Sequence, residues 1–291
     1  MNYLLNNKDI SHLSNYKTPA TARYYFEIKS YDDLDKLYEI VEWSKAYDMS
    51  VLWISGGTNM LFAFDIYDGI VIKNSLRWWS YDVNTKLLKS YWSESIWDIA
   101  ESLEIDYGQD LWHRFIGLPG SVAWAVYWNA GCFGLETENN FLSCEVLDLE
   151  SGQIIVFSKE QMKFSYRTSL LKLEKKYFLV SASFDLSKKI EKYHSDVDNI
   201  DFRENKQPKW NSCWSFFKNP NKDQSAWFLI QEVWLKWYKI WWAYFSDKHA
   251  NFLMHDGTWT YNDLLSLIKI AQDRVFEEFA VKLENEVQII T

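Results

Sequence analysis

Apolar residues recur at every third or fourth position in three segments of the chain, and this spacing predicts amphipathic helices. The segments span residues 30–48, 95–104 and 260–279. In the third segment, Thr260 and Asp263 have the spacing of a capping box, which marks the start of a helix. The residues expected to face the core are Leu34, Leu37, Ile40 and Val41 in the first segment, and Leu264, Ile268, Ala271, Val275 and Phe279 in the third.

Short apolar runs bounded by turn residues predict β-strands between these helices. The runs span residues 51–55, 69–74, 143–149, 152–157, 177–186 and 286–290. We expect the first two to be short buried strands around a turn. Because strands and helices are interspersed, the pattern predicts an α+β fold. Residues 187–209 lose the apolar period and gain charge, which is typical of a connection to a last domain.

One tryptophan-rich segment does not fit this scheme easily. Residues 232–242, with the sequence EVWLKWYKIWW, contain four tryptophans. Trp234, Trp237 and Trp241 have helical spacing, so the first interpretation is a helix stripe that faces the core. The dense packing of protein interiors argues against a stripe that faces the core, because three indole rings on one short helix face need an unusually deep pocket.

The composition shows that this segment belongs to a wider anomaly. The chain has 17 Trp, several times the usual number. It has 10 Gly, about half of what an average glycine usage of about 7% gives for this length. A surplus of tryptophan therefore accompanies a deficit of glycine.

Length and charge narrow the class of protein. The 291 residues suffice for two or three domains. A formal net charge of -9 and a pI of about 5.2 argue against nucleic acid or an anionic membrane as a partner. The first residues lack a basic and apolar leader, and no run of eighteen apolar residues follows, so we expect a cytoplasmic protein. The three cysteines are scattered, which favours reduced thiols over a disulfide framework or a zinc site.

Glycine-containing turns in the first half of the chain can bring backbone N–H groups close to an anionic ligand. The turns are SGGTN at residues 55–59, GLPGSV at residues 117–122 and NAGCFG at residues 129–134. In the second turn, Ser121 stands where a helix can begin and receive a diphosphate. A tight turn explains the first segment equally well, and a purely structural helix entry explains the second. A Rossmann or P-loop site is unsupported, because neither glycine motif occurs.

Polar residues in two later segments suggest substrate chemistry. In FSYRTS, residues 164–169, the fork of Arg167 suits a carboxylate, although a surface ion pair is the alternative. In SFFKNP, residues 215–220, a serine and a lysine flank two aromatic residues. This segment is either a turn before Pro220 or a hydroxyl held beside a cation.

The remaining titratable residues give weaker signals. Glu284 and Glu286 in LENEV are solvated charges unless an anionic or enolic group lies near them. His249 and His255 have no carboxylate or cysteine neighbours at the spacing of metal ligands. We therefore predict no metal site.

Taken in order, SGGTN, GLPGSV with NAG, FSYRTS, SFFKNP, SDKHANF and LENEV resemble the family of UDP-N-acetylenolpyruvoylglucosamine reductases, also called UDP-N-acetylmuramate dehydrogenases. The resemblance covers roughly residues 50–290. It implies FAD in a two-part α+β domain of the vanillyl-alcohol-oxidase (PCMH) type and a C-terminal α+β domain for the substrate. The expected domains are residues 1–70, 71–186 and 187–291.

The family resemblance also implies a reaction. NADPH reduces FAD, the flavin passes hydride to the enolpyruvyl double bond of UDP-N-acetylenolpyruvoylglucosamine, and a proton completes UDP-N-acetylmuramate for peptidoglycan synthesis. The expected partners are these small molecules, without nucleic acid or membrane, and the chain is expected to be a monomer.

The same resemblance assigns roles to individual residues. Ser215 matches the proton donor, Arg167 the arginine near the substrate carboxylate, and Glu286 the glutamate that completes the site. Hydride addition drives negative charge onto that carboxylate, and a cation aimed at developing charge stabilises the transition state. Further substrate contacts are expected from Tyr166, Lys218, Asn219 and His249. FAD contacts are expected from Ser55, Gly56, Gly57, Thr58, Asn59, Gly117, Pro119, Gly120, Ser121, Asn129 and Gly131.

The resemblance offers an explanation for the tryptophans, since many stand where the family pattern has glycine. Our hypothesis is that the source organism decodes UGA as glycine, whereas the printed sequence takes UGA as tryptophan. The positions assigned to glycine are Trp53, Trp92, Trp124, Trp128, Trp214, Trp234, Trp237 and Trp241, with Trp78, Trp210, Trp227, Trp242 and Trp259 as weaker candidates. Trp97 is taken as genuine, and Trp43, Trp79 and Trp112 are undecided.

Two other functions stay open at this point. An aromatic-rich module that binds carbohydrate or a partner predicts tryptophans on exposed faces and not at turns beside a flavin site. Another FAD-dependent oxidoreductase of the same fold is the second alternative, but the order of FSYRTS, SFFKNP and LENEV counts against it.

Overall fold

The computed structural model describes residues 1–188, 212–221, 224–257 and 260–291. Most of the charged segment predicted as a connection, residues 187–209, thus lies outside the described residues. The chain forms two compact units. Unit 1 comprises Met1–Leu4, Tyr25–Gly56 and Gly69–Ile200, and unit 2 comprises Leu5–Tyr24, Gly57–Asp68 and Asp201–Thr291.

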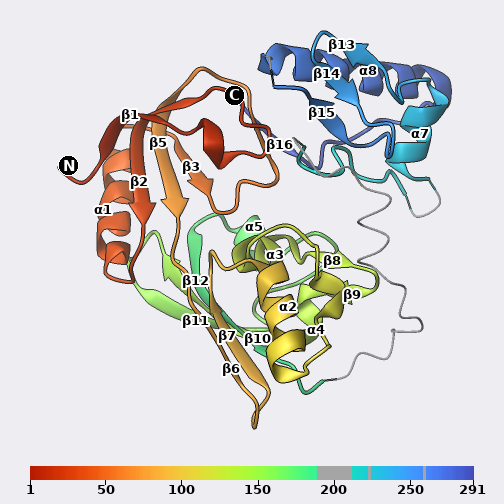
Figure 1. The fold of residues 1–291 in the computed structure, drawn as a ribbon. Helices are drawn as coiled ribbons and strands as arrows, with labels where there is room; N and C mark the ends of the chain where they lie inside the picture. Colours follow the sequence, from red (N-terminus) through yellow and green to blue (C-terminus); the bar gives the residue numbers. More distant parts are fainter. Residues whose placement is uncertain (189–211, 222–223, 258–259) are drawn as a thin grey trace. The chain divides into compact units, whose positions relative to one another are not determined.

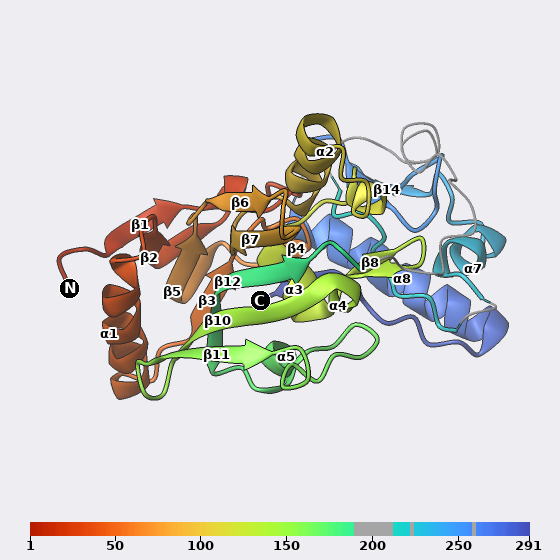
Figure 2. The same cartoon turned by 90° about the horizontal axis from the view of Figure 1, so that it is seen from below.

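Unit 1 contains a five-stranded antiparallel sheet with the strand order β11-β10-β12-β7-β6 (Figures 1 and 2). Its strands are β6 (Trp79–Asp82), β7 (Leu87–Tyr91), β10 (Phe141–Asp148), β11 (Ile154–Ser158) and β12 (Tyr177–Asp185). The structure confirms the strands predicted at residues 143–149, 152–157 and 177–186. The central strand β12 is buried along most of its length, which is why its sequence is rich in apolar residues.

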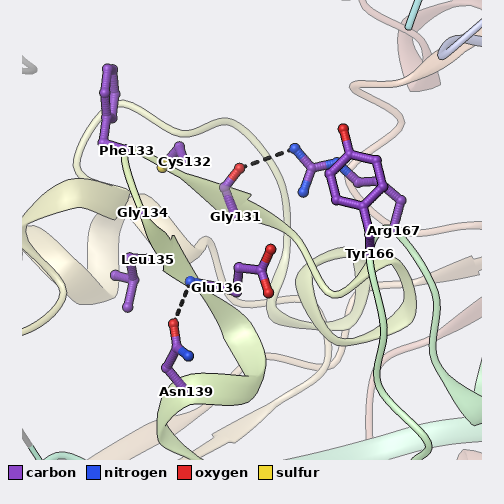
Figure 3. Close-up of a pocket in the computed structure, with 9 residues that line it drawn as sticks. All are labelled: Gly131, Cys132, Phe133, Gly134, Leu135, Glu136, Asn139, Tyr166 and Arg167. Atoms are coloured by element: carbon purple, nitrogen blue, oxygen red, sulfur yellow. Dashed lines mark hydrogen bonds between the residues drawn. The ribbon is translucent and has the colours of Figure 1, made fainter. Parts of the chain in front are cut away.

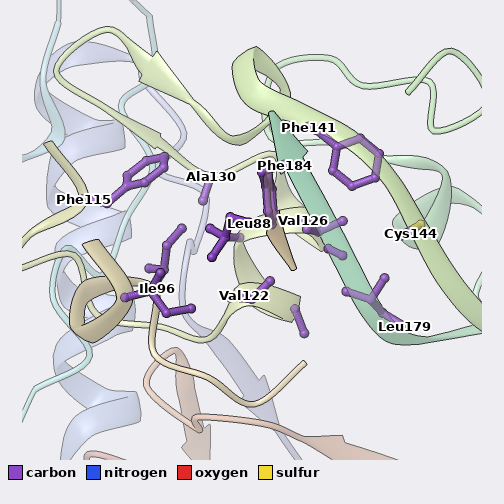
Figure 4. Close-up of a cluster of buried hydrophobic side chains, with 14 of the residues drawn as sticks. Leu88, Ile96, Phe115, Val122, Val126, Ala130, Phe141, Cys144, Leu179 and Phe184 are labelled. Carbon is purple, nitrogen blue, oxygen red and sulfur yellow. The ribbon is translucent and has the colours of Figure 1, made fainter. Parts of the chain in front are cut away.

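Helices pack against this sheet around one hydrophobic core (Figure 4). They are α2 (Ile96–Tyr107), α3 (Val122–Trp128), α4 (Thr137–Asn140), α5 (Leu170–Leu173) and the 3-10 helix η2 (His113–Phe115). The predicted helix α2 begins at Ser95, whose hydroxyl accepts a hydrogen bond from the N–H of Asp98 at 3.2 Å. It ends at Gly108, where φ is 62°, so both ends carry ordinary helix signals.

A second sheet has the order β1-β2-β5-β3. Its strands are β1 (Leu5–Asp9), β2 (Thr21–Ile28), β3 (Val51–Ile54) and β5 (Ile66–Asn74), and the predicted helix is α1 (Asp33–Ala46), with its four expected core residues buried. Strands β3 and β5 pair in parallel, with Val51 opposite Ile70. Both strands were predicted, but their connection by a simple turn is wrong, because parallel neighbours need a longer crossover.

Unit 1 also holds the short antiparallel pair of β8 (Gly131–Cys132) and β9 (Leu135–Glu136). Unit 2 contains further elements, most of which contribute to a second hydrophobic core. They are η1 (Ser11–Leu13), β4 (Met60–Phe62), α7 (Ala226–Glu232), β13 (Lys239–Ile240), β14 (Ala243–Phe245), β15 (Leu253–His255), α8 (Tyr261–Phe279) and β16 (Gln288–Ile290). Strand β16 pairs in parallel with β4, with Gln288 opposite Met60. The end of the chain is therefore fixed beside the segment that follows SGGTN.

Helix α8 confirms the strongest helix prediction, with one correction at its start. Leu264, Ile268, Ala271 and Val275 are buried as expected, and Phe279 is half-buried. Thr260 is the N-cap residue, but its side chain makes no capping hydrogen bond. The N–H of Asp263 donates instead to the backbone carbonyl of Thr260 at 3.1 Å. The predicted capping box does not form.

The tryptophan-rich segment is not a helix that faces the core. Helix α7 ends at Glu232, and Trp234, Trp237 and Trp241 lie in turns, with 86%, 68% and 76% of their surface exposed. The helical interpretation of their spacing is wrong. In the described part of the chain, no helix is long and apolar enough to cross a membrane.

Candidate functional site

The first glycine turn has a structural need for glycine at Gly57. Its φ is 65°, which L side chains rarely adopt. A Cβ atom there would lie 1.7 Å from the carbonyl oxygen of Leu13, in the 3-10 helix η1. Close packing of two backbone segments therefore excludes any side chain at this position.

A hydrogen bond joins the first and second glycine turns. The hydroxyl of Ser55 donates to the hydroxyl of Ser121 at 2.7 Å, across 66 positions of sequence. Ser121 is the N-cap of α3, because its oxygen accepts a hydrogen bond from the N–H of Trp124 at 3.2 Å. The prediction that Ser121 begins a helix is confirmed. Two segments expected to bind one ligand thus lie side by side.

Lys73 in strand β5 supports the first turn, and the sequence analysis missed it. Its ammonium donates to the backbone carbonyl of Ser55. Burial lowers the pKa of Lys73 to about 8, with repulsion by Arg77 acting in the same direction and attraction by Glu27 in the opposite one. The one signal in the sequence was a lysine inside an apolar strand pattern.

The third glycine turn and the FSYRTS segment line a pocket of about 290 Å³ within unit 1 (Figure 3). Arg167 has a left-handed backbone with φ of 55°. Its guanidinium donates to the carbonyl of Gly131 at 3.1 Å and lies 5.0 Å from the centre of the Tyr166 ring. Glu136 and Asn139 line the same pocket. A cation, an aromatic ring and a carboxylate therefore meet beside a glycine turn.

Asn129, predicted to contact FAD, has a side chain that is fully engaged within the protein. Its amide group donates to Glu138 at 2.9 Å and to the carbonyl of Ser165 at 3.2 Å, while its oxygen accepts from the N–H of Glu138 at 3.0 Å. With φ of 44° it also ends helix α3. These contacts join the third turn to the FSYRTS segment.

In unit 2, the residue that follows Ser215 is hydrogen-bonded to Glu286. The carbonyl of Phe216 accepts a hydrogen bond from the N–H of Glu286 at 2.8 Å. Ser215 forms an isolated bridge with Phe252 on the other side. Both Ser215 and Glu286 are half-buried. Arg167 belongs to unit 1, so the predicted catalytic trio is divided between the two units.

Three residues predicted to bind substrate have partners within the protein. Lys218 forms an ion pair with Glu284 at 3.1 Å. The side-chain oxygen of Asn219 accepts a hydrogen bond from the N–H of Ala226 at 3.0 Å, at the start of α7. Burial lowers the pKa of His249 to about 4, so its ring is neutral at pH 7. Their role as substrate contacts stays a prediction.

Four of the eight tryptophans assigned to glycine have a left-handed backbone. They are Trp214, Trp234, Trp237 and Trp241, with φ of 68°, 59°, 66° and 49°. This conformation is uncommon for any side chain and is adopted most readily by glycine. The exposure of Trp234, Trp237 and Trp241 fits the alternative of an aromatic binding module, but their position in turns does not fit it.

Two other tryptophans from that group fit poorly where they are buried. The indole nitrogens of Trp92 and Trp124 are buried and, among the described residues, have no hydrogen-bond partner. A Cβ atom at Gly120 would lie 2.8 Å from the ring of Trp124, which therefore fills the space beside the second glycine turn. A buried donor without a partner costs free energy, so glycine at these positions would remove a penalty. Trp210 and Trp259 lie outside the described residues.

The structure gives no sign of metal chemistry in the residues it describes, where no three His, Cys, Asp or Glu side chains form a group able to hold a metal ion. None of the three cysteines is joined in a disulfide. Burial raises the pKa of the Cys144 and Cys213 thiols to about 12, which makes both poor nucleophiles.

Sequence comparisons identify relatives of this chain. The family model for the C-terminal domain of UDP-N-acetylenolpyruvoylglucosamine reductase matches residues 206–290. The reductase of that name from Fervidobacterium nodosum is 40% identical over 176 residues, which are 60% of this chain and 56% of the relative. The reductase from Protochlamydia amoebophila is 31% identical over 273 residues, which are 92% of this chain and 88% of the relative.

A structural comparison agrees at the level of the fold. The crystal structure of UDP-N-acetylenolpyruvylglucosamine reductase from Thermus caldophilus matches with a TM-score of 0.77. The match covers 98% of each chain at 22% sequence identity. The expected α+β architecture is therefore confirmed over nearly the whole length of the chain.

Proposed function

The chain belongs to the UDP-N-acetylenolpyruvoylglucosamine reductase family, and on that premise we propose that it reduces the enolpyruvyl group of UDP-N-acetylenolpyruvoylglucosamine to give UDP-N-acetylmuramate. FAD is its cofactor and NADPH its reductant. The observation that carries this function is the identity of 31% over 273 residues, supported by the family-model match at residues 206–290. The product serves peptidoglycan synthesis.

The first two turns have features that suit a flavin dinucleotide. Ser55 and Ser121 hold the turns together, and Ser121 also begins helix α3. The indole of Trp124 occupies space beside Gly120, so glycine at position 124 suits the cofactor better. When bound, FAD supplies the transfer of hydride from NADPH to the substrate.

Three residues carry the proposed chemistry at the substrate. Arg167 pairs with the substrate carboxylate and stabilises the charge that develops there during hydride addition. Ser215 donates a proton to the carbon that hydride addition leaves electron-rich. An enolate is basic enough to accept this proton from a hydroxyl group. Glu286 completes the site, and its backbone contact with Phe216 supports a position near Ser215.

The proposal is tested best with the glycine-restored chain, defined as the chain with glycine at positions 53, 92, 124, 128, 214, 234, 237 and 241. The purified protein should be yellow with a flavin absorbance band. It should turn over NADPH continuously only when UDP-N-acetylenolpyruvoylglucosamine is present to reoxidise the flavin, and the product should gain the mass of two hydrogens. A flavoprotein that leaves this substrate unchanged would favour another oxidoreductase, whereas sugar binding without flavin would favour a carbohydrate-binding module.

We further propose that the chain acts as a cytoplasmic monomer on small molecules alone. Its net charge of -9 gives no basic footprint for nucleic acid or anionic lipid. Domain boundaries near residues 70 and 186 remain part of this proposal. Light scattering coupled to size-exclusion chromatography tests the oligomeric state, and a mass near twice 34.8 kDa would contradict the monomer.

A further inference from the structure

We propose that Asn251 is a positioning residue that fixes Ser215 relative to Glu286. Asn251 is 2% exposed and lies in the SDKHANF segment, where the predicted chemistry gives a role to His249 but none to Asn251. The proposal rests on the proposed acid role of Ser215. It concerns unit 2 alone, to which Ser215, Asn251 and Glu286 all belong.

Asn251 holds the two residues after Ser215 through three hydrogen bonds. Its backbone carbonyl accepts from the N–H of Phe216 at 2.8 Å. Its side-chain oxygen accepts from the N–H of Phe217 at 2.9 Å, and its amide donates to the carbonyl of Phe217 at 2.8 Å. The side chain thus pairs with both backbone groups of Phe217, which restrains the two peptide groups on either side of that residue.

The same short segment is held from its other side. The carbonyl of Phe216 accepts from the N–H of Glu286 at 2.8 Å and from the N–H of Val287 at 3.3 Å. Phe217 also forms a bridge with Asn285. Residues 215–217 therefore lie between Asn251 on one side and residues 285–287 on the other. Loss of the Asn251 side chain removes two of the bonds that keep this segment against the Glu286 backbone.

The chemistry makes such positioning matter. A proton donor must lie within hydrogen-bond reach of the carbon or enolate that it protonates, and a displacement of about 1 Å can cost on the order of 10²-fold in rate. Buried side-chain bonds to backbone are the means by which such groups are held. Asn251 touches neither substrate nor flavin in this scheme, so it acts through Ser215.

The test uses rapid mixing with the FAD-loaded, glycine-restored chain. In Asn251→Ala, reduction of the flavin by NADPH should keep its rate constant, because it needs no proton from Ser215. Reoxidation by UDP-N-acetylenolpyruvoylglucosamine should slow by roughly 10- to 100-fold, with a larger solvent deuterium isotope effect. A loss of stability alone would lower the amplitude of the signal and leave the rate constant of the remaining enzyme unchanged.

Two comparison variants make the outcome decisive. Tyr16→Phe removes another buried hydrogen bond of unit 2, from Tyr16 to the carbonyl of Leu253 at 3.1 Å, and should leave both rate constants unchanged. Asn251→Asp keeps the size of the side chain and its acceptor oxygen but loses the amide donor. If Asn251→Ala does not fold, Asn251→Asp takes its place in the test, and its reoxidation should also be slower than that of the parent. If the folded Asn251 variants are reoxidised at the rate of the parent while Ser215→Ala is reoxidised slowly, the proposal is overturned. If Ser215→Ala is also unimpaired, the proposed acid role fails instead.

A second inference rests on backbone geometry and needs no assumption about function. We infer that positions 214, 234, 237 and 241 are glycine positions of the working protein. Position 234 gives the clearest argument, because it follows the end of α7 in a Schellman motif. The N–H of Leu235 donates to the carbonyl of Ile230 at 3.2 Å, and the N–H of Trp234 donates to the carbonyl of Gln231 at 3.0 Å. In this motif the residue at 234 takes a left-handed conformation and is usually glycine.

The exposed side chains agree with this inference. The ring of Trp234 is 86% exposed, so burial does not compensate for its unfavourable backbone conformation. Trp237 and Trp241 combine positive φ with exposure in the same way. With glycine at these three positions, the exposed aromatic surface disappears and the segment consists of ordinary glycine turns.

Thermal unfolding separates the backbone effect from the loss of the ring. Trp234→Gly should raise Tm by roughly 2–4 °C over Trp234→Ala, which lacks the indole but keeps a Cβ atom. Trp97→Gly, in the middle of the first turn of α2, should lower Tm instead. Equal Tm values for Trp234→Gly and Trp234→Ala would overturn the inference. The gene is expected to carry UGA at the four positions and UGG at position 97, and UGG at all five would refute the decoding explanation.

Discussion

The hydroxyl of Ser55 donates a hydrogen bond of 2.7 Å to the hydroxyl of Ser121, and this contact joins two glycine turns that are 66 residues apart in the sequence. Neither turn was a specific signal by itself. Their contact gives one place where backbone from both segments can meet a single ligand. It also means that a change in either turn should disturb the other.

Gly57→Ala should destabilise the protein more than Gly108→Ala. Both positions have a left-handed backbone, so both substitutions should cost about 1 kcal/mol or more. The Cβ atom at position 57 would also collide with the Leu13 carbonyl, whereas nothing lies within 4 Å of one at position 108. Denaturant unfolding measures the free energy of unfolding of both variants. Equal decreases would show that the turn at Gly57 can move away from Leu13 without cost.

Flavin occupancy should differ between the printed and the glycine-restored chains. The ring of Trp124 fills space beside Gly120, and a ring at position 214 stands next to Ser215. We expect the printed chain to bind FAD poorly and the glycine-restored chain to retain it through purification. Absorbance near the flavin band, normalised to protein, measures this. Equal occupancy would refute the steric argument.

Ser215→Ala in the glycine-restored chain should separate the two half-reactions. Flavin reduction by NADPH should be nearly unchanged, because it involves no proton from Ser215. Reoxidation by substrate should slow by about 10²- to 10⁴-fold, the usual contribution of general acid catalysis. Rapid-mixing absorbance follows each step. Reoxidation at the parental rate would remove Ser215 from the acid role and point to Glu286.

Arg167→Ala should slow the same second step but should also weaken substrate binding. A charge-assisted fork to a carboxylate acts in the ground state as well as in the transition state. The concentration of substrate that gives half the maximal reoxidation rate should therefore rise, unlike in Ser215→Ala. Because Arg167 also donates to the Gly131 carbonyl, a thermal unfolding curve is the control for a change in the pocket.

Lys73→Met should stabilise the protein in a pH-dependent way. Burial lowers the pKa of Lys73 to about 8 in the folded state, against 10.5 when exposed. The unfolded chain thus binds more protons between these values, and the penalty for burying the charged amine is full below pH 8 and fades toward pH 10.5. The advantage of Lys73→Met in denaturant unfolding should therefore be larger at pH 7 than at pH 10. An advantage independent of pH would contradict this.

The sequence by itself determined the local elements and the order of the motifs. Helices α1, α2 and α8 and strands β10, β11 and β12 follow from apolar periodicity, because a buried face imposes its repeat on the sequence wherever the element lies. The motifs from SGGTN to LENEV identified the family for the same reason, since each needs particular residue types at fixed spacing. The excess of tryptophan over glycine was also visible without coordinates.

Only the tertiary structure decided which distant residues meet. The parallel pairing of β3 with β5 and of β16 with β4, the bond from Lys73 to Ser55, and the hold of Asn251 on Phe217 all join segments whose local patterns contain no information about their partners. Partner choice depends on burial and hydrogen bonding across the whole fold. Backbone φ is likewise a tertiary property here: the helical spacing of Trp234, Trp237 and Trp241 suggested a core stripe, and their left-handed turns showed positions suited to glycine.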